Sequence, residues 1–134
     1  MAVNWNELMV KLTLFATTYN RKGKITIRLK IYVEDIEAAT AEMNRGKAAG
    51  LDELTIEHLV HSHPVLFVIL AKLFNIIMSA GYVPYGIRLS YTVPLPKVDT
   101  VSSTNTVDNY RAISISPILS KIFERCILKN TVNS

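Results

Sequence analysis

The side chains that could do chemistry in this 134-residue chain are mainly cationic. Lys97 ends one strand-like apolar run and Arg111 begins the next, so pairing the two runs would bring both cations to one end of a hairpin. Lys121, Arg125 and Lys129 recur every four residues, a spacing that places side chains on one face of a helix. Such cations can bind phosphate groups, although an ordinary solvated face has the same spacing.

The acidic residues form no recognisable catalytic site. Two-metal phosphoryl transfer needs carboxylates that converge on two cations about 4 Å apart. The sequence contains no adjacent pair of aspartates, and no serine stands in the setting of a nucleophile elbow. We therefore expect neither a catalytic residue nor a metal site in this chain.

Two other patterns are weaker. Gly46-Lys47 is similar to the end of a phosphate-binding loop, but the first glycine of such a loop is missing and Ala48 replaces the Ser/Thr that would hold magnesium. The second pattern is a group of neighbouring histidines: His58, His61 and His63. No second pair of suitable ligands follows them, so metal binding is not expected there.

The composition indicates one globular domain, with 49% hydrophobic residues and a mild net charge of +4 that makes contact with phosphate plausible. Cys126 is the only cysteine, which excludes an internal disulfide framework and is typical of an intracellular protein; nucleus and cytoplasm are not distinguished. No secretory signal is evident.

The apolar run over residues 65–80 is interrupted by Lys72 and Asn75 and is shorter than the roughly 20 residues that a bilayer needs. It therefore predicts a buried core helix and no membrane contact.

Periodicity predicts an alternation of helices and short strands. In the first half we expect a helix over residues 5–15, a strand over 25–33 with a basic outer face, a helix from Glu34 to Gly46, and another capped by Asp52. In the second half we expect the long apolar helix to end at Gly81, and strands 89–95 and 110–115 to form a hairpin with a long polar tip. A last helix, capped by Ser116-Pro117, buries one apolar face: Ile118, Leu119, Ile122, Phe123, Cys126 and Ile127.

Five sequence blocks, each weak alone, follow one another in a specific order: Gly46–Asp52, Val83-Pro84, Val93–Lys97, Asn109–Ile115 and Ser120–Glu124. Together they resemble the start of the reverse transcriptase (RNA-directed DNA polymerase) domain of non-LTR, LINE-type retrotransposons. The resemblance covers residues 33–128 approximately. It implies an upstream segment at 1–32 and a partial reverse transcriptase domain at 33–134. Family members usually carry proline where this chain has Ala112, a change that should leave the strand intact.

The implied fold is α+β: a helical N-terminal extension plus the β-hairpin of the reverse transcriptase fingers, with palm and thumb absent. By resemblance, Lys97 and Arg111 would bind the incoming deoxynucleotide triphosphate, and Lys47 would contact the RNA or DNA template-primer. Lys121 and Arg125 are expected to contact the same template-primer because of their shared helix face. The family's catalytic aspartates lie downstream of Glu124 in blocks that this sequence lacks. The complete family polymerase uses Mg²⁺, but we expect this fragment to bind no cofactor and to be inactive alone.

Two alternatives remain open from the sequence. The chain could be a free-standing basic module that binds nucleic acid through the face of Lys121, Arg125 and Lys129. It could instead be an inert remnant of a mobile element, in which the apolar face of the last helix is exposed and mediates self-association.

Overall fold

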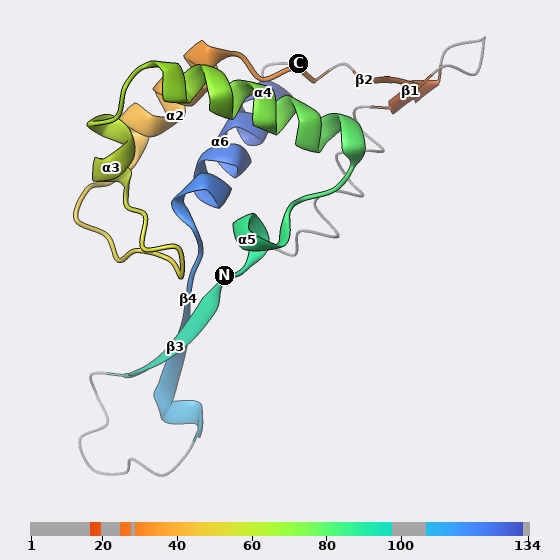
Figure 1. Cartoon of the computed structure of the whole chain (residues 1–134). Helices are drawn as coiled ribbons and strands as arrows, with labels where there is room; N and C mark the ends of the chain where they lie inside the picture. Colours follow the sequence, from red (N-terminus) through yellow and green to blue (C-terminus); the bar gives the residue numbers. More distant parts are fainter. Residues whose placement is uncertain (1–16, 20–24, 28, 98–106, 133–134) are drawn as a thin grey trace.

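The computed structural model describes residues 17–19, 25–27, 29–97 and 107–132. Three helices form the body (Figure 1): α2 (Val33–Glu42), α4 (Val65–Ala80) and α6 (Ile118–Val132). The shorter elements are β1 (Thr17–Tyr19), β2 (Ile25–Ile27), α3 (Ile56–Val60), α5 (Tyr85–Arg88), β3 (Tyr91–Pro96), the 3₁₀ helix η1 (Val107–Asn109) and β4 (Tyr110–Ile115). The described part is thus α+β, and the helix predicted over residues 5–15 lies outside it.

The core lies where α2 packs against both α4 and α6. Phe74 of α4 and Phe123 of α6 are fully buried, and their ring centroids are 4.9 Å apart with the ring planes tilted by 39°. The predicted apolar face of α6 is confirmed, because Ile122, Cys126 and Ile127 are also buried in this core. That face lies in the core of this chain, and the apolar side chains that α6 does expose are Leu128 and Val132.

The predicted hairpin is also confirmed. β3 and β4 pair antiparallel, from Tyr91 opposite Ile115 to Pro96 opposite Tyr110, and the pair projects away from the helical body (Figure 1). Lys97 N–H donates to Asn109 O at 2.8 Å, so the odd-numbered residues of β3 turn their N–H groups toward β4. The two prolines of β3 occupy the alternate positions, where no N–H is needed for pairing.

The run that predicted a strand over residues 25–33 forms only a short one. β2 ends at Ile27 and pairs with β1, and helix α2 follows soon after. Ile31, 1% exposed, still faces the core as the alternation indicated. Its N–H donates to Asn75 Oδ1 at 3.0 Å, and Asn75 Nδ2 donates to its carbonyl at 2.7 Å. A side chain of α4 therefore satisfies both polar groups that a neighbouring strand would otherwise bind.

The helix expected to begin at Asp52 begins later. Asp52 Oδ1 accepts from Leu54 N–H at 3.2 Å, which closes a turn, and Glu53 takes a positive φ of 57°. Thr55 is the residue that precedes α3, with its N–H donating to His58 Nδ1 at 3.0 Å. The aspartate thus shapes a turn ahead of the helix and does not cap it.

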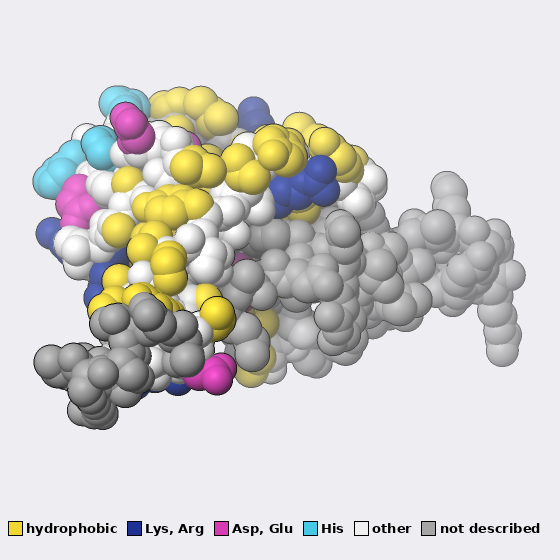
Figure 2. Space-filling view, turned by 90° about the horizontal axis from the view of Figure 1, so that it is seen from below, with side chains coloured by type: hydrophobic (Ala, Val, Ile, Leu, Met, Phe, Trp, Pro, Cys, Tyr) yellow, Lys and Arg dark blue, Asp and Glu magenta, His cyan; other side chains and the backbone are white. Residues whose placement is uncertain are grey.

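The apolar helix α4 is buried on one face only. It ends where predicted, at Gly81, which has a left-handed φ of 64°. Its inner face belongs to the core, as the predicted core helix requires, whereas Val65, Ile69 and Ile76 on its outer face are more than half exposed. Figure 2 shows hydrophobic side chains spread over much of the visible surface. Among the described residues, no helix combines the length and apolar character needed to cross a bilayer.

Candidate nucleic-acid interface

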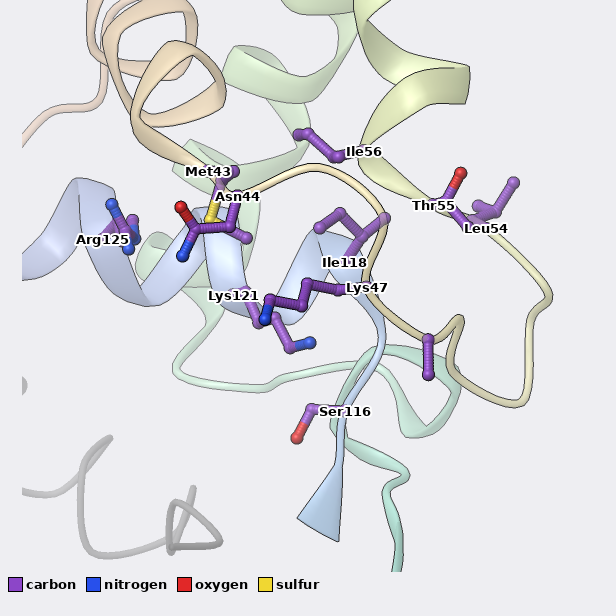
Figure 3. A pocket seen from close by; sticks show the side chains of 11 residues that line it. Met43, Asn44, Lys47, Leu54, Thr55, Ile56, Ser116, Ile118, Lys121 and Arg125 are labelled. Carbon is purple, nitrogen blue, oxygen red and sulfur yellow. The ribbon is translucent and has the colours of Figure 1, made fainter. Parts of the chain in front are cut away.

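Three of the cations predicted to contact nucleic acid lie around one pocket. Lys47 comes from the loop after α2, and Lys121 and Arg125 come from consecutive turns of α6. Figure 3 shows Lys47 and Lys121 extending into the same space, with Arg125 farther along the helix. The structure therefore brings together residues that are far apart in the sequence.

The size and lining of the pocket suit a phosphate group better than a whole nucleotide. Its volume is about 120 Å³, whereas pockets for drug-sized ligands have about 300–1,000 Å³. Its polar lining includes Asn44, Thr55 and Ser116 besides the three cations, and no carboxylate lines it. Such a site has a net positive field and hydrogen-bond donors for an anion. Sequence reasoning missed these three polar residues, because only the fold brings their loops together.

The loop that carries Lys47 is held by contacts at both ends. Gly46 N–H donates to Glu57 Oε1 at 2.7 Å, and Tyr91 Oη donates to Ala49 O at 3.0 Å. Gly50 approaches the start of α6 so closely that a Cβ there would lie 2.9 Å from Pro117 Cα. The glycine-containing block Gly46–Asp52 thus docks against β3 and α6, and this docking places Lys47 beside Lys121.

Gly46-Lys47 does not act as a phosphate-binding loop in this fold. The Gly46 amide is already bonded to the Glu57 carboxylate, so a carboxylate occupies the position that a phosphate would need. The hydrogen bond from Gly46 lowers the pKa of Glu57, with smaller effects from its own backbone, from Thr55 and from Arg45. The rejection of a Walker motif from spacing is therefore supported by the contacts.

Arg125 has a competing partner within the chain. Its Nη1 lies 3.3 Å from Glu42 Oε2 and 3.4 Å from Glu42 O. Both side chains are about half exposed, at 42% and 58%, so this ion pair is solvated and contributes little to stability. A phosphate would replace one anionic partner of Arg125 with another. On its other side Arg125 borders Lys129, so the cationic face of α6 continues beyond the pocket.

The two hairpin cations lie near each other at the far end of β3 and β4. Arg111 pairs with Leu95, and the Lys97 backbone bonds to Asn109, so the two cations are diagonal neighbours across the strands. Both are exposed. Lys97 Nζ donates to Asp108 O at 2.6 Å, a contact within the hairpin that a bound triphosphate would have to replace.

No metal site is found in the described part of the chain. No group of three or more His, Cys, Asp or Glu side chains lies there in a position to hold a metal ion. Two of the three histidines have other roles. His58 Nδ1 accepts from Thr55 N–H, and His63 Nδ1 accepts from Val65 N–H, so both order the starts of helices. Figure 2 shows the histidines gathered at one edge of the molecule.

Cys126 is a core residue, as its surroundings in the sequence predict. It is 0% exposed and has no disulfide partner. Burial raises the pKa of its thiol to about 12, with a further contribution from Asp35 that Lys129 opposes. The thiol is therefore neither a nucleophile nor a metal ligand in the folded protein.

Comparison with known proteins agrees with the resemblance at a coarse level. No family model matches the chain. It is 33% identical over 101 residues to the RNA-directed DNA polymerase from mobile element jockey of Drosophila melanogaster. The match covers 73% of this chain but only 10% of that polymerase. The chain is therefore a distant relative of a mobile-element reverse transcriptase and spans about a tenth of its length.

Proposed function

We propose that this chain is a retrotransposon-derived part of a reverse transcriptase that contacts template-primer nucleic acid, and that Lys47, Lys121 and Arg125 bind its phosphates. The observation that carries the proposal is the convergence of these three cations around a pocket without a lining carboxylate. Each belongs to, or lies directly beside, a block that resembles the polymerase family. The sequence similarity to a mobile-element polymerase supports the reverse transcriptase origin in this proposal.

The hairpin has a second role in this proposal, as the fingers segment that binds the incoming deoxynucleotide triphosphate through Lys97 and Arg111. What supports it is the diagonal position of the two cations on a projecting two-stranded hairpin. A guanidinium can bind phosphate oxygens in a bidentate manner, and an exposed hairpin can move over a ligand.

Burial of the apolar face of α6 also favours a folded module over an inert remnant. A remnant that had lost its packing partner would expose Ile122 and Phe123, but both are fully buried within this chain. Slow amide exchange in α6 is the expected result for a packed module, and fast exchange throughout α6 would favour the remnant.

The test is a fluorescence-anisotropy titration of a labelled primer-template with the full chain. We expect Lys47→Ala, Lys121→Ala and Arg125→Ala each to weaken binding roughly 3- to 10-fold, as loss of a charge-assisted hydrogen bond does. Lys72→Ala is the matched control, since it removes the same charge from the exposed face of α4. Equal losses in the pocket and control variants would refute the site.

The hairpin is tested separately with a labelled deoxynucleotide triphosphate added to the chain and its preformed primer-template complex. Lys97→Ala/Arg111→Ala should weaken nucleotide binding while leaving primer-template affinity within about 2-fold, because the pocket cations are intact. A double variant that binds the nucleotide as the parent chain does would remove the hairpin from the proposal.

A further inference from the structure

The segment between α4 and β3 is fixed to the body by two small apolar anchors. Val83 and Ile87 are 5% and 8% exposed and belong to the core. Pro84 O accepts from Ile87 N–H at 3.0 Å and from Arg88 N–H at 3.3 Å, which closes the short helix α5. The backbone of this segment therefore has a defined position beside α6, which α5 contacts.

The same segment presents its large side chains to solvent. Tyr82 and Tyr85 are 58% and 61% exposed. The Arg88 guanidinium carbon lies 6.0 Å from the centre of the Tyr82 ring and 5.6 Å from that of Tyr85. Both distances are within the range of cation–π interactions, so one arginine draws two tyrosines into a cluster.

This cluster contributes little to the fold. The rings are mostly outside the core, and among the described residues no carboxylate pairs with the Arg88 guanidinium. Single exposed aromatic residues are common on proteins. Two exposed rings that share one guanidinium, on a backbone held by buried anchors, form a preorganised surface of planar groups.

Planar groups of these kinds bind unpaired nucleobases. Bases in single strands stack on tyrosine rings and on guanidinium planes, and a nearby cation adds attraction to the backbone phosphates. We infer that Tyr82, Tyr85 and Arg88 form a stacking platform for the bases of single-stranded RNA or DNA. The platform shares no residue with the cationic pocket, so it does not rest on the function proposed for that pocket.

The experiment compares two fluorescein-labelled 12-mers of equal charge, oligo(dT) and a base-free deoxyribose phosphate oligomer, by anisotropy. Each is titrated with the full chain and with Tyr82→Ala/Tyr85→Ala. Stacking is worth a factor of about 5 or more per base. The double alanine variant should therefore bind oligo(dT) at least about 5-fold more weakly, and the base-free oligomer within about 2-fold of the parent chain.

Two controls separate stacking from other effects. Tyr82→Phe/Tyr85→Phe keeps both rings and should bind oligo(dT) within about 2-fold of the parent chain. Tyr32→Ala removes a tyrosine that is 55% exposed and has its own cation, Lys30 Nζ, at 5.4 Å, and it should have no comparable effect. Circular dichroism of each variant confirms that the helices are retained.

Several results would overturn the platform. One is unchanged oligo(dT) binding by the double alanine variant, and another is an equal loss for both oligomers. Failure of the parent chain to bind oligo(dT) at all would do the same. The pocket predicts a different pattern, because Lys121→Ala should weaken both oligomers alike through their phosphates. The two proposals can therefore fail separately.

Discussion

Asn75 of α4 provides the sharpest test of how the helical body is held together. Its side chain bonds both polar groups of Ile31, with the N–H at 3.0 Å from Oδ1 and the carbonyl at 2.7 Å from Nδ2. In Asn75→Leu, both groups of the 1% exposed Ile31 would lose their partner. Each buried group left without a hydrogen bond costs about 1–3 kcal/mol.

The expected net effect is a loss of about 2–4 kcal/mol in the free energy of unfolding, since burial of leucine returns at most about 1–2 kcal/mol. This is a large share of the roughly 5–15 kcal/mol that stabilises most domains. The measurement is equilibrium urea unfolding followed by circular dichroism. Faster amide exchange at Ile31 should accompany the loss.

Two variants control this prediction. Ser79→Ala removes a hydroxyl that donates to the carbonyl of Asn75 within the same helix, at 2.9 Å, and should change stability by less than about 0.5 kcal/mol. Asn75→Asp keeps the shape but lacks the Nδ2 donor, so its stability relative to the parent should improve at low pH, where a protonated carboxyl can donate again. A stability of Asn75→Leu within about 0.5 kcal/mol of the parent would refute the reasoning.

Three further predictions concern the pocket and the core. Glu42→Gln removes the carboxylate that lies 3.3 Å from Arg125. This variant should bind primer-template about 2- to 5-fold more tightly, and its stability should change by less than about 1 kcal/mol. Weaker binding in the same anisotropy assay would contradict this prediction. Gly50→Ala places a Cβ 2.9 Å from Pro117 Cα, so the loop that carries Lys47 must shift. Urea unfolding should therefore show a loss of about 1–3 kcal/mol in the free energy of unfolding, and anisotropy should show a weaker affinity for primer-template. Burial raises the pKa of Cys126 to about 12, so its thiol should resist iodoacetamide at pH 8 and react once urea unfolds the chain. Mass spectrometry would measure the labelling. Rapid labelling of the folded chain would contradict the burial of this thiol.

Local patterns in the sequence are sufficient for several elements of this fold. Gly81 ends α4 because a left-handed residue is needed there, and the apolar spacing after Pro117 identifies the buried face of α6. The strand β4 follows from its own residues, Tyr110–Ile115. These features depend on neighbours within a few positions, which is why periodicity and turn chemistry predict them.

The elements that were mispredicted depend on distant partners. The alternation ahead of α2 indicates an extended segment, but its partner at Ile31 is a side chain of α4 and not a strand, which no local pattern reveals. Asp52 has the chemistry of a helix cap, and only the positive φ at Glu53 shows that it closes a turn. Tertiary contacts decided both cases.

The candidate site shows the same division. The shared face of Lys121 and Arg125 follows from helical spacing alone. That Lys47 joins them depends on the close approach of Gly50 to Pro117, a contact between segments far apart in the chain. The partners Glu42 and Glu57 could not be assigned before the fold was known, since each acts across a distance in sequence.

The measurement that tests the central claim most directly is the salt dependence of primer-template affinity for two doubly substituted chains of equal charge. Lys47→Ala/Lys121→Ala removes two cations from the pocket, and Lys30→Ala/Lys72→Ala removes two from elsewhere on the surface. If Lys47 and Lys121 each neutralise one backbone phosphate at or beside the pocket, the log–log slope should fall in magnitude by about 1.4–1.8 in the first variant and hardly change in the second. Equal slopes in the two variants would contradict the claim that this pocket is where the chain contacts nucleic acid.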